Sequence, residues 1–466
     1  MFAEAEIVCG GDMLVRSGEA VRKAYADTDP DLREAINRGE NPIIDISVSF
    51  NGTWQKRGFT SLYGVGICVD VLTGHVVDDA VLSKDCHACK LQVAKNLPEA
   101  ELAACREEHA ADRCRNHHQS SKSMEQEAAK IMWQHSVEKF SFRYAEMLSD
   151  GNSAAYKAVC DIAPYGEKVI NKLECVNHAH ERMGTALRKL AKEERLGCRG
   201  VGRLTENKCD SLQNFYRGAI LNNIPNIDKM RSAVWASLFH SMSTDASPQH
   251  QRCPEGVDSK CFYQKALARG EQPGSHQDHP SHTALSREVA EKMLPVYRRM
   301  SDENLLQRMI HGGTQNTNEC LNPTIWAHCP KTLFWRLKHI EGSVARAVCV
   351  FNEGTHELVG LMNKMYMDIS FDTLRLLAEK DERRMKKGDA AAKVEAQCHH
   401  KEHTLHRQQQ ARAEDSMVMY MVQEPTNIVL WATAEQAFFC CAWIVICRCE
   451  RVTEYLCADV CEAVCS

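Results

Sequence analysis

Cysteine and histidine side chains lie close together at three places in the chain, in spacings that would suit a metal ion. The first group has the ligand number and types of a structural zinc site: Cys86, Cys89, His109 and Cys114. The polar stretch around them has too few apolar residues for a core of its own, so zinc would supply the missing folding energy. His117 and His118 are alternative ligands, and unligated thiols in a loop are the competing interpretation.

The other two groups lie further along the chain. One surrounds a Pro-Glu-Gly turn and could hold a second zinc ion: it comprises His250, Cys253 and Cys261, with His240 upstream. The other is the pair Cys175 and His178, three residues apart at the start of a predicted helix and therefore on one helix face. Two ligands do not complete a metal site, so a buried cysteine beside a capping histidine is the alternative.

The composition and the first residues of the chain indicate whether its thiols are reduced or oxidised. The chain has 466 residues, 23 cysteines and 21 histidines. It begins without a basic segment followed by an apolar one, so no secretory signal is expected and the thiols should stay reduced. The net charge of −5 requires any DNA-binding surface to be a local basic patch. One apolar run, residues 438–447, is only about half the roughly 20 residues that a membrane helix needs.

Hydrophobic periodicity predicts the elements that would position these groups. Apolar residues alternate with polar ones over residues 44–50, which predicts a half-buried strand. Asn51-Gly52 should then turn the chain into a hairpin, with further strands at 62–71 and 75–82. A helix is expected over 123–140 and a strand over 144–149, which ends at Asp150. Residues 1–40, most of 174–308, and 369–412 have helical patterns.

Four motifs in this order resemble those of Mutator-like transposases. Residues 51–58 read NGTWQKRG, where the family has DGTWQKRG, so Asn51 replaces an aspartate. Residues 149–152 (SDGN) resemble the second acidic motif, and Cys175 with His178 resembles a CxxH element. Residues 315–319 (QNTNE) resemble the motif that supplies the last glutamate. The similarity extends from about residue 41 to about residue 352.

This resemblance implies an RNase H-like α/β core with a large helical insertion and Cys/His-rich loops. The implied divisions are an N-terminal helical segment (1–40), a transposase domain (41–352), a charged helical extension (353–415) and a divergent Cys-rich tail (416–466). Within the domain, a Cys/His insertion would span about 86–118 and a helical insertion about 174–308. For the tail, a buried helix and a membrane anchor are the alternatives.

The resemblance also implies a reaction. Asn51, Asp150 and Glu319 occupy the positions of a DDE triad, which binds Mg²⁺ or Mn²⁺ and cleaves and transfers DNA strands. An ordinary Asp-Gly turn at Asp150 and a solvated helix glutamate at Glu319 are the competing interpretations. The CxxH pair would lie near the acidic centre, orienting it or contacting DNA. The implied partners are transposon terminal repeats, target DNA and further copies of the chain, in the nucleus and without a membrane.

Asn51 weakens the expected metal site, because an amide oxygen brings no negative charge. Asp45 is six residues earlier, roughly 20 Å along an extended strand, and cannot replace the missing carboxylate. The chain is therefore either a transposase or a catalytically silent DNA-binding or zinc-rich interaction protein. Trp54, Lys56 and Arg57 place an aromatic ring and two cations beside the centre, where they could stack on a base and bind phosphates. A second basic run, over residues 188–203, is better explained as a solvated helix face.

Overall fold

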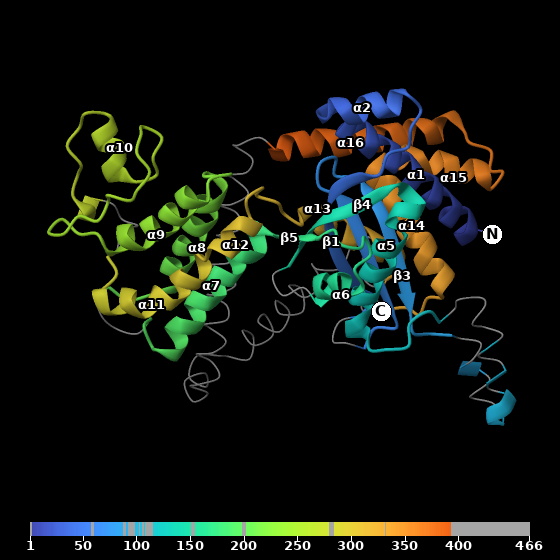
Figure 1. Ribbon diagram of the computed structural model, residues 1–466, viewed down its shortest axis with the longest axis horizontal. Helices are drawn as coiled ribbons and strands as arrows, with labels where there is room; N and C mark the ends of the chain where they lie inside the picture. The colour runs from blue at the N-terminus through green and yellow to red at the C-terminus, as the bar shows by residue number, and fades with distance from the viewer. Residues whose placement is uncertain are drawn as a thin grey trace, which may run out of the picture. The chain divides into compact units, whose positions relative to one another are not determined.

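The computed structural model describes most of the chain up to residue 392 (Figure 1). The described residues are 2–56, 60–86, 90–91, 98–101, 103–104, 107, 115–150, 154–197, 202–278, 284–330 and 332–392. Contacts divide the chain into two compact units, 1–378 and 379–466, and in the second only residues 379–392 are described. Within the described stretches, every helix is too short or too polar to cross a membrane.

Five strands form one mixed sheet: β1 (Ile44–Trp54), β2 (Tyr63–Asp70), β3 (Val76–Ser83), β4 (Phe142–Ser149) and β5 (Asn171–Glu174). Their order is β3-β2-β1-β4-β5. β1 is antiparallel to β2, and β2 to β3, whereas β1, β4 and β5 are parallel. The prediction of a mixed α/β protein is confirmed, and so are the four predicted strands. The short strand β5 was not predicted.

Helices pack on both faces of the sheet because its strands alternate their apolar side chains. Phe50 on β1 packs with Trp133 of α5 (Met124–Phe140), at 5.9 Å between ring centroids. On the other face, Val65 and Ile67 of β2 pack against residues of α13 (Asn316–His328), α14 (Leu337–Asn352) and α1 (Phe2–Thr28). β1 therefore lies between α5 and α13.

The expected turn at Asn51-Gly52 is wrong. β1 continues through both residues to Trp54, with Asn51 opposite Ile67 and Gly52 opposite Gly66. Gly52 allows α5 to approach β1 closely instead of forming a turn, because a Cβ atom there would lie 2.9 Å from Cγ of Glu125. Glycine inside a strand commonly marks such a contact with another element.

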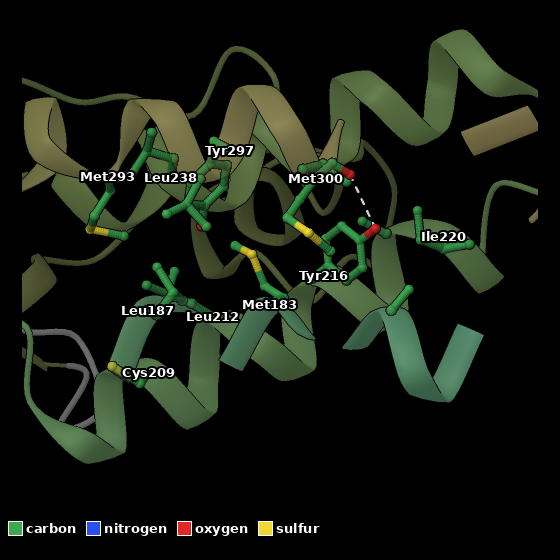
Figure 2. Packing of buried hydrophobic residues seen from close by; sticks show 14 of the residues in the cluster. Met183, Leu187, Cys209, Leu212, Tyr216, Ile220, Leu238, Met293, Tyr297 and Met300 are labelled. Carbon is green, nitrogen blue, oxygen red and sulfur yellow. Dashed lines mark hydrogen bonds between the residues drawn. The ribbon is translucent and has the colours of Figure 1, made fainter. Parts of the chain in front are cut away.

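A helical region lies between β5 and α13, as predicted. Its helices are α7 (Val176–Glu193), α8 (Glu206–Leu221), α9 (Ile227–Met242), α10 (Phe262–Ala268), α11 (Arg287–Met300) and α12 (Glu303–Arg308). Figure 2 shows that α7, α8, α9 and α11 contribute to one apolar core, in which the Tyr216 hydroxyl donates a hydrogen bond to the Met300 carbonyl (3.1 Å). This core is separate from the two apolar clusters on the sheet.

The other described helices lie before, within and after the sheet in chain order. α2 (Pro30–Asn37) begins at a proline, and the Asp29 carboxylate caps it by accepting from the backbone of Asp31 and Leu32. α6 (Ala154–Ile162) packs on α5. α15 (Leu358–Lys364) and α16 (Phe371–Ala392) follow α14. Short 3₁₀ turns occur at Ser121–Ser123, His276–Asp278 and Thr355–Glu357.

Candidate active site and metal cluster

Asn51 lies on the face of β1 that α13 covers. The residues two before and two after it on the strand both bond to that helix. The Ser49 hydroxyl donates to the Asn318 side-chain oxygen (2.6 Å), and the Trp326 indole N–H donates to the Thr53 hydroxyl (2.9 Å). Since side chains alternate along a strand, Asn51 shares the face of Ser49 and Thr53. Its side chain is half-buried.

Asp150 directly follows β4, the parallel neighbour of β1. The last pair between these strands joins Ser49 to Leu148. Asn51 and Asp150 are each two residues beyond that pair, and neighbouring strands are about 4.8 Å apart. The two positions are therefore adjacent at the same end of the sheet, and Asp150 is exposed there.

Glu319 lies in the first turn of α13, whose start is fixed to β1. The Gln315 amide donates to the Phe50 carbonyl (2.7 Å), and the fully buried Asn318 amide donates to the Ser49 and Ile67 carbonyls (both 3.3 Å). The Glu319 side chain keeps about half of its surface exposed (51%). The structure thus places Asn51 and Asp150 on neighbouring strands and bonds the helix that carries Glu319 to β1, although the three positions are far apart in sequence.

The CxxH pair lies beside Glu319. Cys175 is buried at the junction of β5 and α7, and His178 Nε2 lies 3.4 Å from the Glu319 carboxylate. A hydrogen bond with Cys175 raises the pKa of His178 to about 9 against the effect of burial, with smaller contributions from the charges of Cys175 and Glu319. Burial raises the pKa of the Cys175 thiol, but hydrogen bonds involving His178 and the Gln315 backbone outweigh it, so the net shift is downward. This arrangement favours a cationic imidazole next to Glu319.

A four-residue cluster in the helical region has the geometry of a zinc site. Its ligand atoms lie within 4.8 Å of one another and come from His240, His250, Cys253 and Cys261. The two Nδ1 atoms are 3.2 Å apart, and Cys261 Sγ is 3.4 Å from His250 Nδ1. Around a tetrahedral zinc with bonds of about 2.0–2.3 Å, ligand atoms would lie roughly 3.3–3.8 Å apart. The donor set of two thiols and two imidazoles therefore fits zinc.

Outer hydrogen bonds orient His250 toward this cluster. Its Nε2 lies 3.0 Å from His276 Nε2 and 2.9 Å from the Ser243 hydroxyl, while His276 Nδ1 lies 2.5 Å from the Asp245 carboxylate. If His276 donates through Nδ1 to Asp245, its Nε2 accepts from His250. His250 then has a free lone pair on Nδ1, which faces the cluster. Carboxylate–histidine chains of this kind fix the tautomer of metal-binding histidines.

The sequence comparison decides the family of the chain. The model of the Mutator-like transposase family matches residues 21–261, just over half of the chain. The chain belongs to the Mutator-like transposase family. No match was found among curated proteins or solved structures. The matched range includes Asn51, Asp150 and the His/Cys cluster, whereas Glu319 lies beyond it and depends on its motif and position.

Two oxygen-donor carboxylates beside Asn51 suit the hard ions Mg²⁺ and Mn²⁺ that this family implies. Asp150 and Glu319 would hold such an ion, and the Asn51 amide could add a neutral oxygen. Asp45 does not help, because its carboxylate is paired with Arg143 (2.6 Å) and Lys168. The chemistry of the donor set therefore fits the metal but is short of one negative charge.

Several predicted ligands are not tested. Cys89, His109, Cys114 and Arg57 lie outside the described residues, as does the tail, so the first zinc site stays a prediction. Cys86 is described and buried. Trp54 is half-buried, packs on the α5 side of the sheet and donates its indole N–H to the Ser121 carbonyl (2.9 Å). Lys56 is exposed after β1. In the second basic run, Arg188 pairs with Glu206 and Asp210.

One acid beside β1 has no recognisable signal in the sequence. Glu125, the second residue of α5, packs against Gly52, where an added Cβ would lie 3.2 Å from Glu125 Cδ. Burial raises the pKa of its carboxyl group to about 7; the charge of Asp150 adds to the rise, and a hydrogen bond from the Gly52 backbone opposes it. No spacing marks Glu125 in the sequence, because acids are common in the first turn of any helix.

Proposed function

We propose that this chain is a DDE-type transposase, or a protein derived from one, whose ancestral reaction is metal-dependent cleavage and transfer of DNA strands. The proposal is supported by the adjacency of positions 51 and 150 on neighbouring strands, and by the bonding of α13, which carries Glu319, to β1 in a member of this family. The strand order β3-β2-β1-β4-β5, with its parallel β1, β4 and β5, supports an RNase H-like core.

In this function, Asp150 and Glu319 position the ions, and α13 holds Glu319 against β1 through Gln315 and Asn318. Two bound divalent ions would activate the attacking oxygen of water or a DNA 3′ hydroxyl and stabilise the leaving oxygen. The cationic His178 beside Glu319 orients that carboxylate. Asn51 contributes an oxygen without a charge, so at least one ion would bind weakly.

The same family membership supports further parts of the proposal, which concern zinc, DNA contacts, localisation and assembly. The cluster of His240, His250, Cys253 and Cys261 would bind a structural zinc ion that braces α9 and α10. Trp54, Lys56 and Arg57 would contact DNA next to the site, with terminal repeats and target DNA as the substrates. Nuclear localisation and assembly into a homo-oligomer belong to this proposal.

A nicking assay on plasmid or terminal-repeat DNA tests the reaction. The wild type should cut little or not at all with Mg²⁺ or Mn²⁺, and Asn51→Asp should raise cleavage by restoring a charged ligand. Asp150→Ala in the Asn51→Asp background is the control and should abolish the gain. Robust cleavage by the wild type that Asp150→Ala removes would show that Asn51 is tolerated. No cleavage by Asn51→Asp on an authentic terminal repeat would contradict an otherwise intact site.

A second candidate function is DNA binding without catalysis, and the neutral Asn51 favours it. This candidate predicts salt-dependent DNA affinity but no cleavage in either background. A zinc-rich interaction protein, the third candidate, would show neither DNA affinity nor DNA cleavage. The two assays together therefore separate the three candidates.

A further inference from the structure

The helical region contains a cavity of about 240 Å³ beside the His/Cys cluster. It lies where α8 and α9 pack side by side (Figure 1), and Phe215 lines it with 40% of its surface exposed. The helices leave space because four lining residues are small: Gly218, Ala219, Ala233 and Ala236. His240, Cys253 and Cys261 of the cluster also line it. A zinc ion about 2 Å from its ligands would fill only a small part of this volume.

The volume and the charges of the cavity limit what it can hold. An engineered cavity of about 150 Å³ binds benzene, so this larger one has room for a larger planar ring. Lys260 and Asp258 are both exposed and line the cavity with opposite charges. A zinc ion bound by two thiolates and two neutral imidazoles carries no net charge. The cavity should therefore favour a neutral ring over an ion.

One side chain in the cavity suits a ring with a polar edge. Asn222 follows α8 as its C-cap and lines the cavity. Its backbone N–H donates to the Gly218 carbonyl (3.1 Å), but its side-chain amide has no hydrogen-bond partner among the residues that the structure describes. An amide presents an acceptor oxygen beside donor hydrogens, a pattern that pairs with the edge of a base such as adenine. Aromatic rings such as Phe215 stack on the face of any base.

We propose that this cavity binds a nucleobase, with Phe215 against the face of the ring and Asn222 at its edge. Two sources present the same chemistry: a base extruded from a DNA strand and a free nucleotide. The lining residues all belong to the helical region and include none of the positions 51, 150 and 319. Base binding requires no strand cleavage, so its test is independent of the proposed reaction.

Oligonucleotides that differ by one base test the inference. The probes are two single strands of abasic residues with equal length and phosphates, and one of them carries a single adenine. In fluorescence anisotropy, the full-length, zinc-loaded protein should bind the strand with adenine more tightly. Phe215→Ala should weaken binding of that strand by about fivefold or more, because base stacking is lost, and leave the other unchanged. Phe371→Ala, at an aromatic ring outside the cavity with 79% of its surface exposed, should change neither.

A side chain at Gly218 should block the cavity. A Cβ atom there would meet only Asn222 Nδ2, at 3.9 Å, so a leucine has room to enter. Gly218→Leu should remove the advantage of the strand with adenine while the zinc content stays that of the wild type. Gly11→Leu is the matched control, because it changes another helical glycine with no atom within 4 Å of the new Cβ. It should keep the advantage.

Deoxyadenosine monophosphate distinguishes the two sources of the base. If it binds in isothermal titration calorimetry and Gly218→Leu removes this binding, a free nucleotide is sufficient. If only the strand with adenine binds more tightly, the base must belong to a strand. Equal binding of the two strands together with no binding of the nucleotide would refute the inference. An adenine advantage that both Phe215→Ala and Gly218→Leu leave intact would also refute it, because the base would then bind elsewhere.

Discussion

At the residue scale, His178 should determine how the candidate site responds to pH. Its pKa is raised from the ordinary value of 6.5 to about 9, chiefly by the hydrogen bond with Cys175. A histidine with a raised pKa contributes stability that is fully present below its unfolded pKa and is lost as pH rises through its folded pKa. We therefore expect the melting-temperature difference between wild type and His178→Gln to be largest below pH 6.5 and to shrink up to about pH 9.

His180 provides the matched control on the same helix. Burial lowers its pKa, so its protonation destabilises the fold at low pH and has no effect above pH 7. The stability difference for His180→Gln should stay constant between pH 7 and 9, measured by thermal denaturation in metal-free buffer. A difference for His178→Gln that is equally constant over this range would mean that the imidazole carries no proton there.

Individual site residues were predictable only where a motif marks them. Asn51, Asp150, Glu319 and the CxxH pair were found because short strings of neighbours identify them. Glu125 has no such string, and its close approach to β1 depends on a missing Cβ atom at Gly52 on another element. Local sequence cannot report a contact between α5 and β1, because that contact exists only after the sheet has formed.

At the element scale, the packing of α5 on the sheet depends on small residues in β2. A Cβ at Gly66 would lie 2.6 Å from Cβ of Ala128 and 3.1 Å from Cε of Met132. Gly66→Ala should therefore cost about 1–3 kcal/mol by overpacking. Gly11→Ala in α1 has no atom within 4 Å of the new methyl group and should stabilise the protein by roughly 0.5–1 kcal/mol. Urea denaturation of both variants tests the contrast, and a neutral Gly66→Ala would show that α5 can shift away.

The His/Cys cluster should hold the segment from α9 to α10 in place. Cys253→Ser should remove about one zinc ion per chain and lower hydrogen-exchange protection at residues 240–268, since zinc binding contributes folding free energy. Cys160→Ser changes an exposed thiol outside the cluster and is the control. Elemental analysis and hydrogen exchange give the two readouts. Unchanged zinc content in Cys253→Ser would exclude zinc at this cluster.

Sequence periodicity predicted the long helices and strands well. It ended β1 too early and missed the short strand β5. The alternation over residues 44–50 placed β1, but Asn-Gly is the strongest short hairpin signal and it falsely ended the strand. Tertiary packing decided otherwise, because β2 pairs with β1 through Trp54 and Glu125 needs the space at Gly52. β5 has four residues, too few to establish a period, and so it was missed.

At the scale of the whole molecule, two apolar regions meet next to the candidate site. The core of the helical region is built from residues between Val176 and Met309, and the sheet has its own clusters. The Val176 backbone donates to the Gly313 carbonyl (3.1 Å), and the Asn177 amide donates to the Asn316 side chain (2.7 Å). The start of α7 is thus bonded to the loop before α13 and to its first residue, so changes in the helical region can reach Glu319.

DNA affinity is the property that involves the whole molecule, because its net charge of −5 opposes binding to a polyanion. Binding must then depend on local cations that displace counterions from phosphates. Each phosphate contact contributes about 0.9 to the slope of log affinity against log salt. If Lys56 and Arg57 each contact a phosphate, the double variant Lys56→Ala, Arg57→Ala should reduce the magnitude of this slope by roughly two and weaken binding to all sequences alike.

Lys189→Ala is the comparison, since this residue belongs to the second basic run but is largely exposed (71%) and lies 3.7 Å from Glu193. Its slope should match that of the wild type, because a solvated helix cation releases no counterion from DNA that it does not touch. Fluorescence anisotropy on a labelled duplex between about 50 and 200 mM salt covers the range in which such slopes are measured. An unchanged slope for the double variant, together with a reduced slope for Lys189→Ala, would contradict DNA contacts at the end of β1. It would indicate that the helical region binds DNA instead.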